Sequence, residues 1–261
     1  MKNNNRSYLF VPATDKLLSK IPLCKADAVI IDLEDSIPES DKMESLKRVV
    51  EFLKDNNNQN IYIRINSDNY KEEISQLDGF EIKGYMIPKT ETVSDVDKIS
   101  AVTSKEIIAL VESINGVINI DSIAKCDRVS AIAFGAEDFT SQAGIFNDDF
   151  YLSYTKNRIV LHTKACNKNV IDTISLNIKD EEKYRAVALN SKKFGFDGKL
   201  AIHPMQVDII NDIFNDDIKL YVDIVSKYDS SDLAVLEIDG KIYEKPHIDA
   251  MKRKIKEYYN D

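Results

Sequence analysis

A chain of 261 residues, of which 43% are hydrophobic, can bury a large core, and α/β barrels of about 250 residues form single domains. The formal net charge of −9 argues against a surface built for nucleic acid, although it permits a local basic patch that meets an anionic ligand. We therefore expect a soluble enzyme, with one barrel as the leading interpretation and no nucleic-acid partner.

The cysteines and the N-terminus indicate where such a protein works. Cys24, Cys126 and Cys166 are far apart and have no CxxC spacing, so they indicate neither a zinc site nor a disulfide framework. We therefore expect a reducing, cytoplasmic location. The first residues, MKNNNRSYLF, lack the apolar core of a signal peptide, and no apolar run approaches the roughly 18 residues of a membrane span. Neither export nor a membrane partner is expected.

Strand-like and helix-like segments alternate from the start of the chain to Pro204. The expected strands are 7–12, 27–34, 61–66, 84–89, 106–113, 129–134, 170–176 and 198–204. A mixed polar and apolar stretch lies at 15–21, and helical patterns lie at 38–54, 70–77, 94–102, 115–126, 151–167 and 181–194. Eight strands that alternate with helices predict an α/β fold, a closed (β/α)8 TIM barrel.

An open, doubly wound sheet uses the same repeating units and is the main structural alternative. The dinucleotide fingerprint GxGxxG and the phosphate-binding GxxxxGK[ST] are both missing, and the chain has only eight glycines. Nicotinamide and ATP chemistry are therefore disfavoured, and the number of strands favours a closed barrel.

The last part of the chain follows a completed barrel. Residues 206–229 have a helical pattern, residues 233–243 predict a hairpin or extended arm with the turn Asp239-Gly240, and a final helix is expected over 247–259. We expect a barrel domain of residues 1–215 and a C-terminal helical and hairpin extension of residues 216–261.

Two acids follow consecutive predicted strands. Glu112 comes at the end of the strand 106–113, and Asp138 follows Gly135, with Glu137 beside it, after the strand 129–134. The ends of neighbouring parallel strands lie about 5 Å apart, so Glu112 and Asp138 could reach one cation. On spacing alone, two unrelated surface acids are an equally good interpretation.

A charged residue on an apolar strand needs a partner. Burying Arg64 is costly without an anion, and the strand 27–34 brings Asp32 and Glu34 to the same end of the barrel. Arg64 therefore either forms a structural ion pair with these acids or holds a substrate carboxylate through two parallel hydrogen bonds.

The lysine and histidine candidates have open interpretations. Lys89 can be a solvated or ion-paired lysine within the acidic cluster. His203, at the end of the strand 198–204, is as easily a packed, hydrogen-bonding residue as a reactive one. His162 and His247 fall on helical faces and are expected to be structural.

Eight short motifs occur in one order along the chain. They are RSYLFVP (6–12), AVIIDLEDSIP (28–38), IRIN (63–66), MIPK (86–89), ALVESING (109–116), FGAEDF (134–139), AIHPMQ (201–206) and DGKIYEKP (239–246). Together they resemble the citrate lyase beta subunit and malyl-CoA lyase group of the HpcH/HpaI aldolase superfamily. The resemblance covers essentially the whole chain. It implies a TIM barrel, a divalent cation (Mg²⁺, or Mn²⁺) and carbon–carbon lyase chemistry on acyl thioesters.

The resemblance assigns roles to residues that match the family's motifs. It implies that Glu112 and Asp138 are the two metal ligands, that Glu112 thereby also takes part in substrate binding, and that Arg64 grips the carboxylate of the oxo acid during catalysis. Glu137 lies at a position that the family does not fix.

Further matches concern the rest of the substrate. Phe10, Ile202 and His203 correspond to places where such enzymes approach the substrate or the coenzyme A moiety. Lys16 and Lys20 stand, after a gap of one residue, where relatives often carry an arginine and a lysine that face the phosphates.

Two departures from the family pattern matter. Many malyl-CoA lyases have an aspartate in a C-terminal arm that reaches the active site of a neighbouring subunit, whereas this chain has Glu244. The resemblance thus implies a homo-oligomer, a trimer, with Glu244 either catalytic or a solvated residue beside Lys241 and Lys245. The HpcH-type aldolases have a histidine where this chain has Asp35, which favours the citrate lyase beta side.

The expected reaction is the cleavage, or formation, of a citryl, malyl or citramalyl thioester of coenzyme A or acyl carrier protein. It yields an acyl thioester and an oxo acid, and it needs a base for the hydroxyl proton and an acid for the departing enolate. A metal-dependent aldolase for free hydroxy-oxo acids and a non-catalytic subunit of a larger lyase are the alternatives. The sequence leaves the acyl group, its carrier and the physiological direction open.

Overall fold

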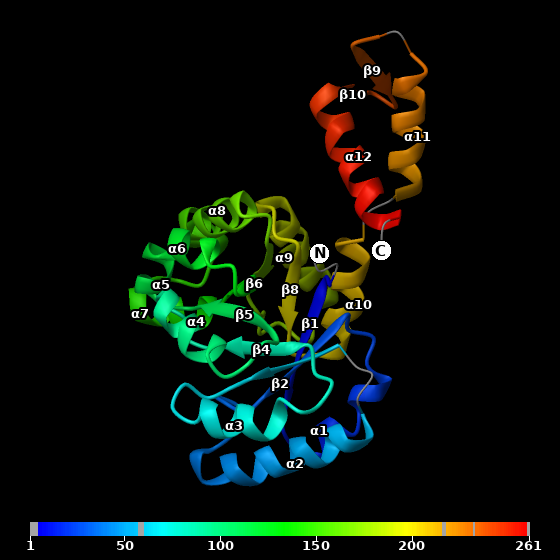
Figure 1. The fold of residues 1–261 in the computed structure, drawn as a ribbon. Coiled ribbons are helices and arrows are strands. Elements are labelled where there is room, and N and C mark those ends of the chain that lie inside the picture. Colours follow the sequence, from blue (N-terminus) through cyan, green and yellow to red (C-terminus); the bar gives the residue numbers. More distant parts are fainter. Residues whose placement is uncertain (1–4, 57–59, 216–217, 232, 260–261) are drawn as a thin grey trace. The chain divides into compact units, whose positions relative to one another are not determined.

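A computed structural model describes residues 5–56, 60–215, 218–231 and 233–259. The chain separates into two compact units, Met1–Phe214 and Asn215–Asp261 (Figure 1). The first unit contains the barrel and the second contains the C-terminal helices and hairpin, and each is described by itself.

Eight parallel strands close into a barrel in sequence order, with β8 pairing back to β1. They are β1 (Ser7–Pro12), β2 (Ala28–Asp32), β3 (Ile61–Arg64), β4 (Gly84–Ile87), β5 (Glu106–Val111), β6 (Val129–Phe134), β7 (Asn169–Asp172) and β8 (Gly198–Ala201). The predicted (β/α)8 barrel is therefore confirmed, because only a closed sheet pairs its first strand with its last.

Helices surround the strands of the first unit (Figure 1). The α-helices are α1 (Asp15–Leu18), α2 (Lys42–Asp55), α3 (Tyr70–Leu77), α4 (Val93–Ser100), α5 (Ile114–Ile118), α6 (Ile120–Lys125), α7 (Ala136–Ala143), α8 (Asp149–Ala165), α9 (Glu181–Phe194) and α10 (Pro204–Ile213), and the 3-10 turns are η1 (Ile21–Leu23) and η2 (Glu39–Asp41). Among the described helices, none combines the length and the apolar character that a bilayer crossing requires.

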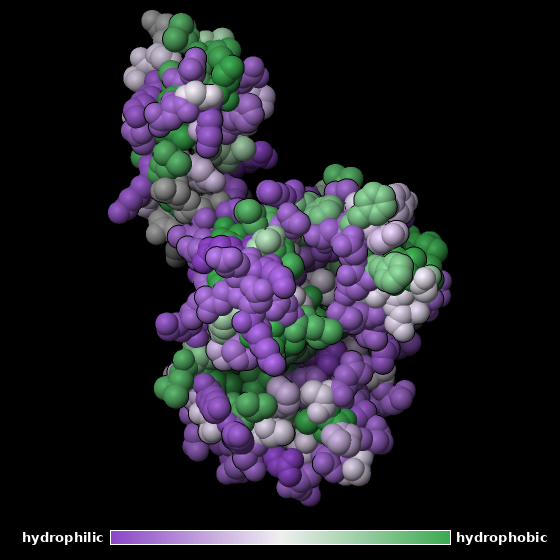
Figure 2. Space-filling model, turned by 180° about the vertical axis from the view of Figure 1, so that it is seen from behind, coloured by the Kyte–Doolittle hydropathy of each residue, from purple (hydrophilic) through white to green (hydrophobic). Residues whose placement is uncertain are grey.

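The apolar runs of the strands fill two layers of core. Along β2, Val29 and Ile31 pack in the layer between strands and helices, while Ala28 and Ile30 pack inside the barrel. Successive side chains of a strand point to opposite faces, so a strand that is buried on both faces is apolar without interruption. On the face drawn in Figure 2 most side chains are hydrophilic, and hydrophobic side chains are exposed in several places.

Several segments differ from the sequence-based expectation. The helix expected over 115–126 is split into α5 and α6 at Asn119, whose side-chain amide donates to the Glu91 carbonyl at 3.0 Å. The helical pattern over 206–229 is two helices, because α10 ends at Ile213. The strand expected over 170–176 ends at Asp172, the last residue that pairs with β8.

The helix α7 was not expected from the sequence. It directly follows β6, with Gly135 as its N-cap, and its eight residues are too few to show a clear helical period. Glu137 and Asp138 therefore lie in the first turn of a helix rather than at the tip of a strand.

The second unit is a helical pair joined by a hairpin. It consists of α11 (Ile218–Asp229), β9 (Val235–Ile238), β10 (Lys241–Glu244) and α12 (Lys245–Tyr259). The two residues between the strands, Asp239 and Gly240, both have positive φ, as the Asp-Gly hairpin turn requires. The predicted hairpin is confirmed.

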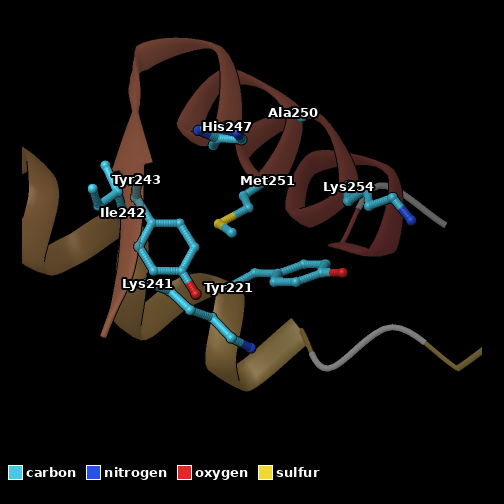
Figure 3. Close-up of a pocket in the computed structure, with 8 residues that line it drawn as sticks. All are labelled: Tyr221, Lys241, Ile242, Tyr243, His247, Ala250, Met251 and Lys254. Carbon is cyan, nitrogen blue, oxygen red and sulfur yellow. The ribbon is translucent and has the colours of Figure 1, made fainter. Parts of the chain in front are cut away.

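Apolar and ionic contacts hold the second unit together. Ile248 of α12 is 1% exposed, and the Lys252 ammonium of α12 lies 2.8 Å from the Asp229 carboxylate of α11. A groove of about 480 Å³ remains between α11, β10 and α12, where Tyr221, Tyr243 and Met251 come together (Figure 3).

Candidate active site

A cavity of about 510 Å³ opens at the carboxyl ends of the barrel strands. Its walls come from β1, β2, β3, β5, β6, β7 and β8 and from the loops that follow them. The lining residues are Phe10, Pro12, Asp32, Asp35, Ser36, Arg64, Leu110, Glu112, Gly135, Glu137, Asp138, Thr173, Ile174, Leu200 and Ile202. In barrels of this kind, catalysis occurs at this end, because each strand delivers side chains there from a rigid support.

The pairing of β5 with β6 brings the two predicted metal ligands to one cavity. The strands are parallel neighbours, and the Gly135 N–H donates to the Val111 carbonyl at 3.0 Å. A Cβ atom on Gly135 would lie 2.7 Å from Oε2 of Glu112, so only glycine allows the chain to pass so close to this carboxylate. The predicted adjacency of the two strand ends is confirmed, and Asp138 follows three residues after Gly135.

Glu112 is a buried acid in a negative environment. It is 4% exposed, and its Oε1 accepts a hydrogen bond of 2.7 Å from the Lys89 backbone N–H. Burial is the largest cause that raises the pKa of Glu112, to about 8, and the charges of Glu34 and Asp138 act in the same direction. A cation beside Glu112 would remove this penalty on the ionised form.

The donor set fits a magnesium ion. The described residues contain no group of three or more histidine, cysteine or acidic side chains placed to hold a metal, so a cation here would rest on Glu112 and Asp138. Mg²⁺ commonly binds through one or two carboxylates and keeps its other positions for water or substrate. The burial of Glu112 and the exposure of Asp138 toward the cavity are consistent with such a site.

The two neighbouring acids of α7 have different surroundings. Oε1 of Glu137 accepts a hydrogen bond of 2.7 Å from the Asn147 side-chain amide. Asp138 is exposed, and its position in the first turn places its carboxylate near the positive end of the helix dipole. This difference agrees with Asp138, rather than Glu137, being the acid available to a cation.

Arg64 makes the structural ion pair that the sequence left open. Its Nε and one terminal nitrogen lie 2.7 Å from the two oxygens of Asp32, and its other terminal nitrogen lies 3.1 Å from Asp35 and 3.3 Å from Glu34. Burial opposes ionisation of Asp32, but the Arg64 hydrogen bonds hold its pKa below the ordinary value. The Arg64 guanidinium also lies 4.9 Å from the centre of the Phe10 ring.

The ion pair does not use Arg64 completely. Asp32 fixes one edge of the guanidinium and is buried, whereas the Asp35 side chain on the other edge is 53% exposed. Arg64 also lines the cavity, and the nitrogen that contacts Asp35 contacts the buried Glu34 as well.

Lys89 connects Glu34 with the cavity acid Glu112. Its ammonium lies 3.0 Å from Glu34, as one interpretation of the sequence expected, and its backbone N–H contacts Glu112. Lys89 has a φ of 49°, which is uncommon for a residue with a side chain and costs about 1 kcal/mol or more. Sequence reasoning missed the role of this N–H, because a backbone donor has no signature in residue type.

The remaining barrel candidates are dispersed. Phe10 and Ile202 line the cavity, as expected for substrate contacts. His203 is the N-cap of α10, where its Nδ1 accepts from the Met205 N–H at 3.2 Å, and it is not among the described residues that line the cavity. Lys16 in α1 and Lys20 just after it are exposed.

Three residues outside the cavity complete the set of candidates. Glu244 ends β10 of the second unit and is exposed, so its role stays a prediction. His162 lies on α8 with its Nδ1 3.2 Å from Asp121, and His247 lies on α12 with its Nδ1 accepting from the Glu244 N–H at 3.1 Å. The His162 contact joins α8 to α6, and the His247 contact is local, so both histidines have the structural kind of contact that was expected.

We expect Glu112→Gln to stabilise the metal-free protein at pH 8. The folded pKa of Glu112 lies above the ordinary value of 4.5, so the wild type loses stability as the pH rises from about 4.5 to about 8, on the order of a few kcal/mol at most. The glutamine keeps an acceptor for the Lys89 N–H but does not ionise.

Thermal unfolding in a chelator at pH 5 and pH 8 measures this effect. The advantage of Glu112→Gln should be small at pH 5 and larger at pH 8, and Glu137→Gln serves as the matched control on a neighbouring acid. Equal advantages at both pH values would contradict the assignment of a buried, strained charge to Glu112.

Comparisons with known proteins agree with this geometry. The chain is 28% identical to the (3S)-malyl-CoA thioesterase of Cereibacter sphaeroides, over 93% of this chain and 90% of that protein. It is 29% identical to citrate lyase subunit beta of Leuconostoc mesenteroides, over 80% and 76% of the two chains.

A solved structure shows the same fold. The crystal structure of CitE from Mycobacterium tuberculosis, in complex with magnesium, acetoacetate and coenzyme A, superposes with a TM-score of 0.78 at 22% identity and covers 97% of this chain and 98% of that chain. The sequence profile of the family HpcH/HpaI aldolase/citrate lyase matches residues 6–204, which include every strand of the barrel. The protein therefore belongs to the HpcH/HpaI aldolase/citrate lyase family.

Proposed function

We propose that the protein is a Mg²⁺-dependent oxo-acid lyase. It cleaves or forms a hydroxyacyl thioester, such as a citryl, malyl or citramalyl thioester of coenzyme A or acyl carrier protein, with an acyl thioester and an oxo acid as the other reactants. The observation that carries the proposal is the meeting of Glu112 and Asp138 with Arg64 in one cavity. To hold a chelating oxo acid, an enzyme needs two carboxylates that bind the metal ion and a positively charged side chain that binds the carboxylate of the acid.

The relatives support the substrate class. One is a malyl-CoA thioesterase, another is a subunit of citrate lyase, and the CitE structure contains magnesium, acetoacetate and coenzyme A. Hydrolysis of the thioester is a second candidate function, because the malyl-CoA thioesterase matches nearly the whole chain.

Each cavity residue has a defined part in the proposed mechanism. Glu112 and Asp138 hold the Mg²⁺ ion, or Mn²⁺ in its place, which when bound supplies a Lewis acid for the negative charge on the oxo acid. Arg64 binds the carboxylate of that acid with the edge that Asp35 now occupies, and Asp32 keeps the guanidinium oriented. The substrate is thereby fixed at both ends before its carbon–carbon bond breaks.

Apolar side chains and surface lysines are proposed to receive the thioester. Phe10 and Ile202 form part of the cavity wall and exclude water from the enolate that carbon–carbon cleavage produces. Lys16 and Lys20 are exposed on and beside α1, where they can meet the phosphates of a coenzyme A or acyl-carrier arm. The free thiols of the three cysteines support a cytoplasmic location.

We propose that Glu244 of one subunit completes the site of the next in a homotrimer. Glu244 is exposed at the end of β10, and the hairpin around it leaves apolar side chains uncovered, with Val235 46% and Ile242 61% exposed. Ile242 and Tyr243 also line the open groove of the second unit (Figure 3). A hairpin with this composition is suited to pack on another protein surface, and its carboxylate can then deliver or accept a proton.

Product analysis distinguishes the candidate functions. With Mg²⁺ and citryl-, malyl- or citramalyl-CoA, the lyase should release oxo acid and acyl-CoA without free thiol. A thioesterase releases free coenzyme A instead, and an aldolase turns over the free hydroxy-oxo acid. Absence of turnover with all thioesters of coenzyme A and acyl carrier protein would contradict the proposal and favour a non-catalytic subunit.

Arg64→Lys should reduce kcat/KM by roughly thirtyfold, about 2 kcal/mol of transition-state binding, because lysine keeps the charge but loses the planar fork. Arg6→Lys is the matched control, since Arg6 makes a similar two-pronged pair with Asp27, at 2.8 and 3.0 Å, just before β1. Normal turnover by Arg64→Lys would show that Arg64 does not bind the substrate carboxylate and has only its structural role in the ion pair with Asp32.

Complementation tests the shared site. Glu244→Gln and Arg64→Ala, each expected to be inactive alone, should recover part of the activity when co-expressed, because mixed oligomers contain some sites with both native residues. Glu112→Gln co-expressed with Arg64→Ala is the control, since both changes fall in the barrel and no such site can form. Full activity of Glu244→Gln alone would remove Glu244 from the mechanism.

A further inference from the structure

A buried ionic cluster lies behind the cavity wall, between β7, β8 and α8. Asp172 of β7 and Lys199 of β8 are both 0% exposed, and Lys156 of α8 is 4% exposed. The Lys199 and Lys156 ammonium groups lie 3.1 and 3.3 Å from the same oxygen, Oδ2 of Asp172, which also accepts a hydrogen bond from the Ser191 hydroxyl. None of these four residues lines the cavity.

Such a cluster is a costly way to fill a core. Each buried ion has a desolvation penalty of several kcal/mol, and apolar residues of similar volume often serve stability as well or better. Buried ionic groups do, however, fix a local geometry that apolar packing leaves loose. The cluster is therefore expected to hold a particular part of the backbone in place.

This part of the backbone is the segment that follows β7, because Lys199 makes its second contact there. Its ammonium donates to the Thr173 carbonyl at 2.7 Å, one residue after Asp172, where the chain turns into the cavity. Lys199 thus holds the residue that follows the strand as well as the strand itself.

Thr173 in turn contacts α7, the helix that carries Asp138. Thr173 is 5% exposed, lines the cavity, and its hydroxyl accepts a hydrogen bond of 3.0 Å from the N–H of Ala136. Ala136 is the first residue of α7, and the first N–H groups of a helix have no acceptor within it. The Thr173 hydroxyl therefore fixes the start of α7 two residues before Asp138.

We propose that Thr173, anchored by Lys199, is a positioning residue for the metal centre: it sets where α7 begins and so holds the Asp138 carboxylate opposite Glu112. The inference rests on the proposed metal site and adds Thr173, which directly follows β7, to a centre whose ligands are Glu112, directly after β5, and Asp138 of α7. It follows that the cluster around Asp172 serves the site through the backbone, without touching substrate or metal.

Metal affinity of the full-length protein tests this inference. Calorimetric titration with Mg²⁺ and the paramagnetic resonance signal of bound Mn²⁺ should show about tenfold weaker binding for Thr173→Val, which keeps the shape but removes the acceptor, a typical effect for a group that supports a metal ligand. Thr173→Ser keeps the hydroxyl and should bind within about twofold of the wild type.

A second buried threonine separates positioning from stability. Thr163 of α8 is 0% exposed, and its hydroxyl donates to the Ile159 carbonyl at 2.7 Å, so Thr163→Val also removes a buried hydroxyl. It should bind metal as the wild type does, whatever its Tm. Wild-type affinity in Thr173→Val, or equal weakening in Thr163→Val and Thr173→Val, overturns the inference.

Lys199 and the proposed metal site are tested in the same titration. Lys199→Met should weaken binding, and its effect should not add to that of Thr173→Val, because both act through one contact. The threonine variants decide the question if Lys199→Met fails to fold. Wild-type affinity in Glu112→Gln would show instead that the metal site itself is wrong, and the inference would fall with it.

Discussion

The burial of Glu112 among other acids is the constraint on which the site depends. Glu34 and Asp138 add negative charge around a carboxylate that is 4% exposed, and its pKa rises to about 8. The β5–β6 pairing brings Gly135 so close to this carboxylate that a Cβ atom there would lie 2.7 Å from its Oε2. The proposed metal ion would offset this negative charge.

Asp32 and Glu34 differ from Glu112 because they contact side-chain cations. Asp32 is held by the Arg64 fork, and Glu34 lies between Arg64 and Lys89, whereas Lys89 offers Glu112 only its backbone N–H. Asp32 and Glu34 are therefore neutralised by Arg64 and Lys89, whereas Glu112 has no side-chain cation among its hydrogen-bond partners in the described residues. Arg64 and Glu112 both line the cavity, which agrees with the proposed ligand that carries a carboxylate and a chelating oxygen.

Support for this arrangement extends beyond the residues that face the cavity. The hydroxyl of Thr173 meets the start of α7, and the ammonium of Lys199 meets the carbonyl of Thr173. The buried Lys199 is therefore connected, through Thr173, to the helix that carries the cavity acid Asp138. The second unit adds an exposed hairpin that ends in Glu244, and its uncovered apolar side chains agree with the proposal that the working enzyme is an oligomer.

The barrel, the hairpin turn at Asp239-Gly240 and the placement of Glu112 and Asp138 at one cavity could be predicted from the sequence. These follow from local patterns: alternating apolar runs, a dipeptide with positive φ, and acids placed after consecutive strands. Only the three-dimensional structure shows which residues contact one another, because a sequence pattern records residue types but no contact partners. It gave Arg64 its pair with Asp32, made His203 a helix cap, and revealed the roles of the Lys89 N–H and the Thr173 hydroxyl. The contacts of Arg64, the Lys89 N–H and the Thr173 hydroxyl join segments that meet only when the barrel closes, whereas the His203 cap is a local contact with Met205.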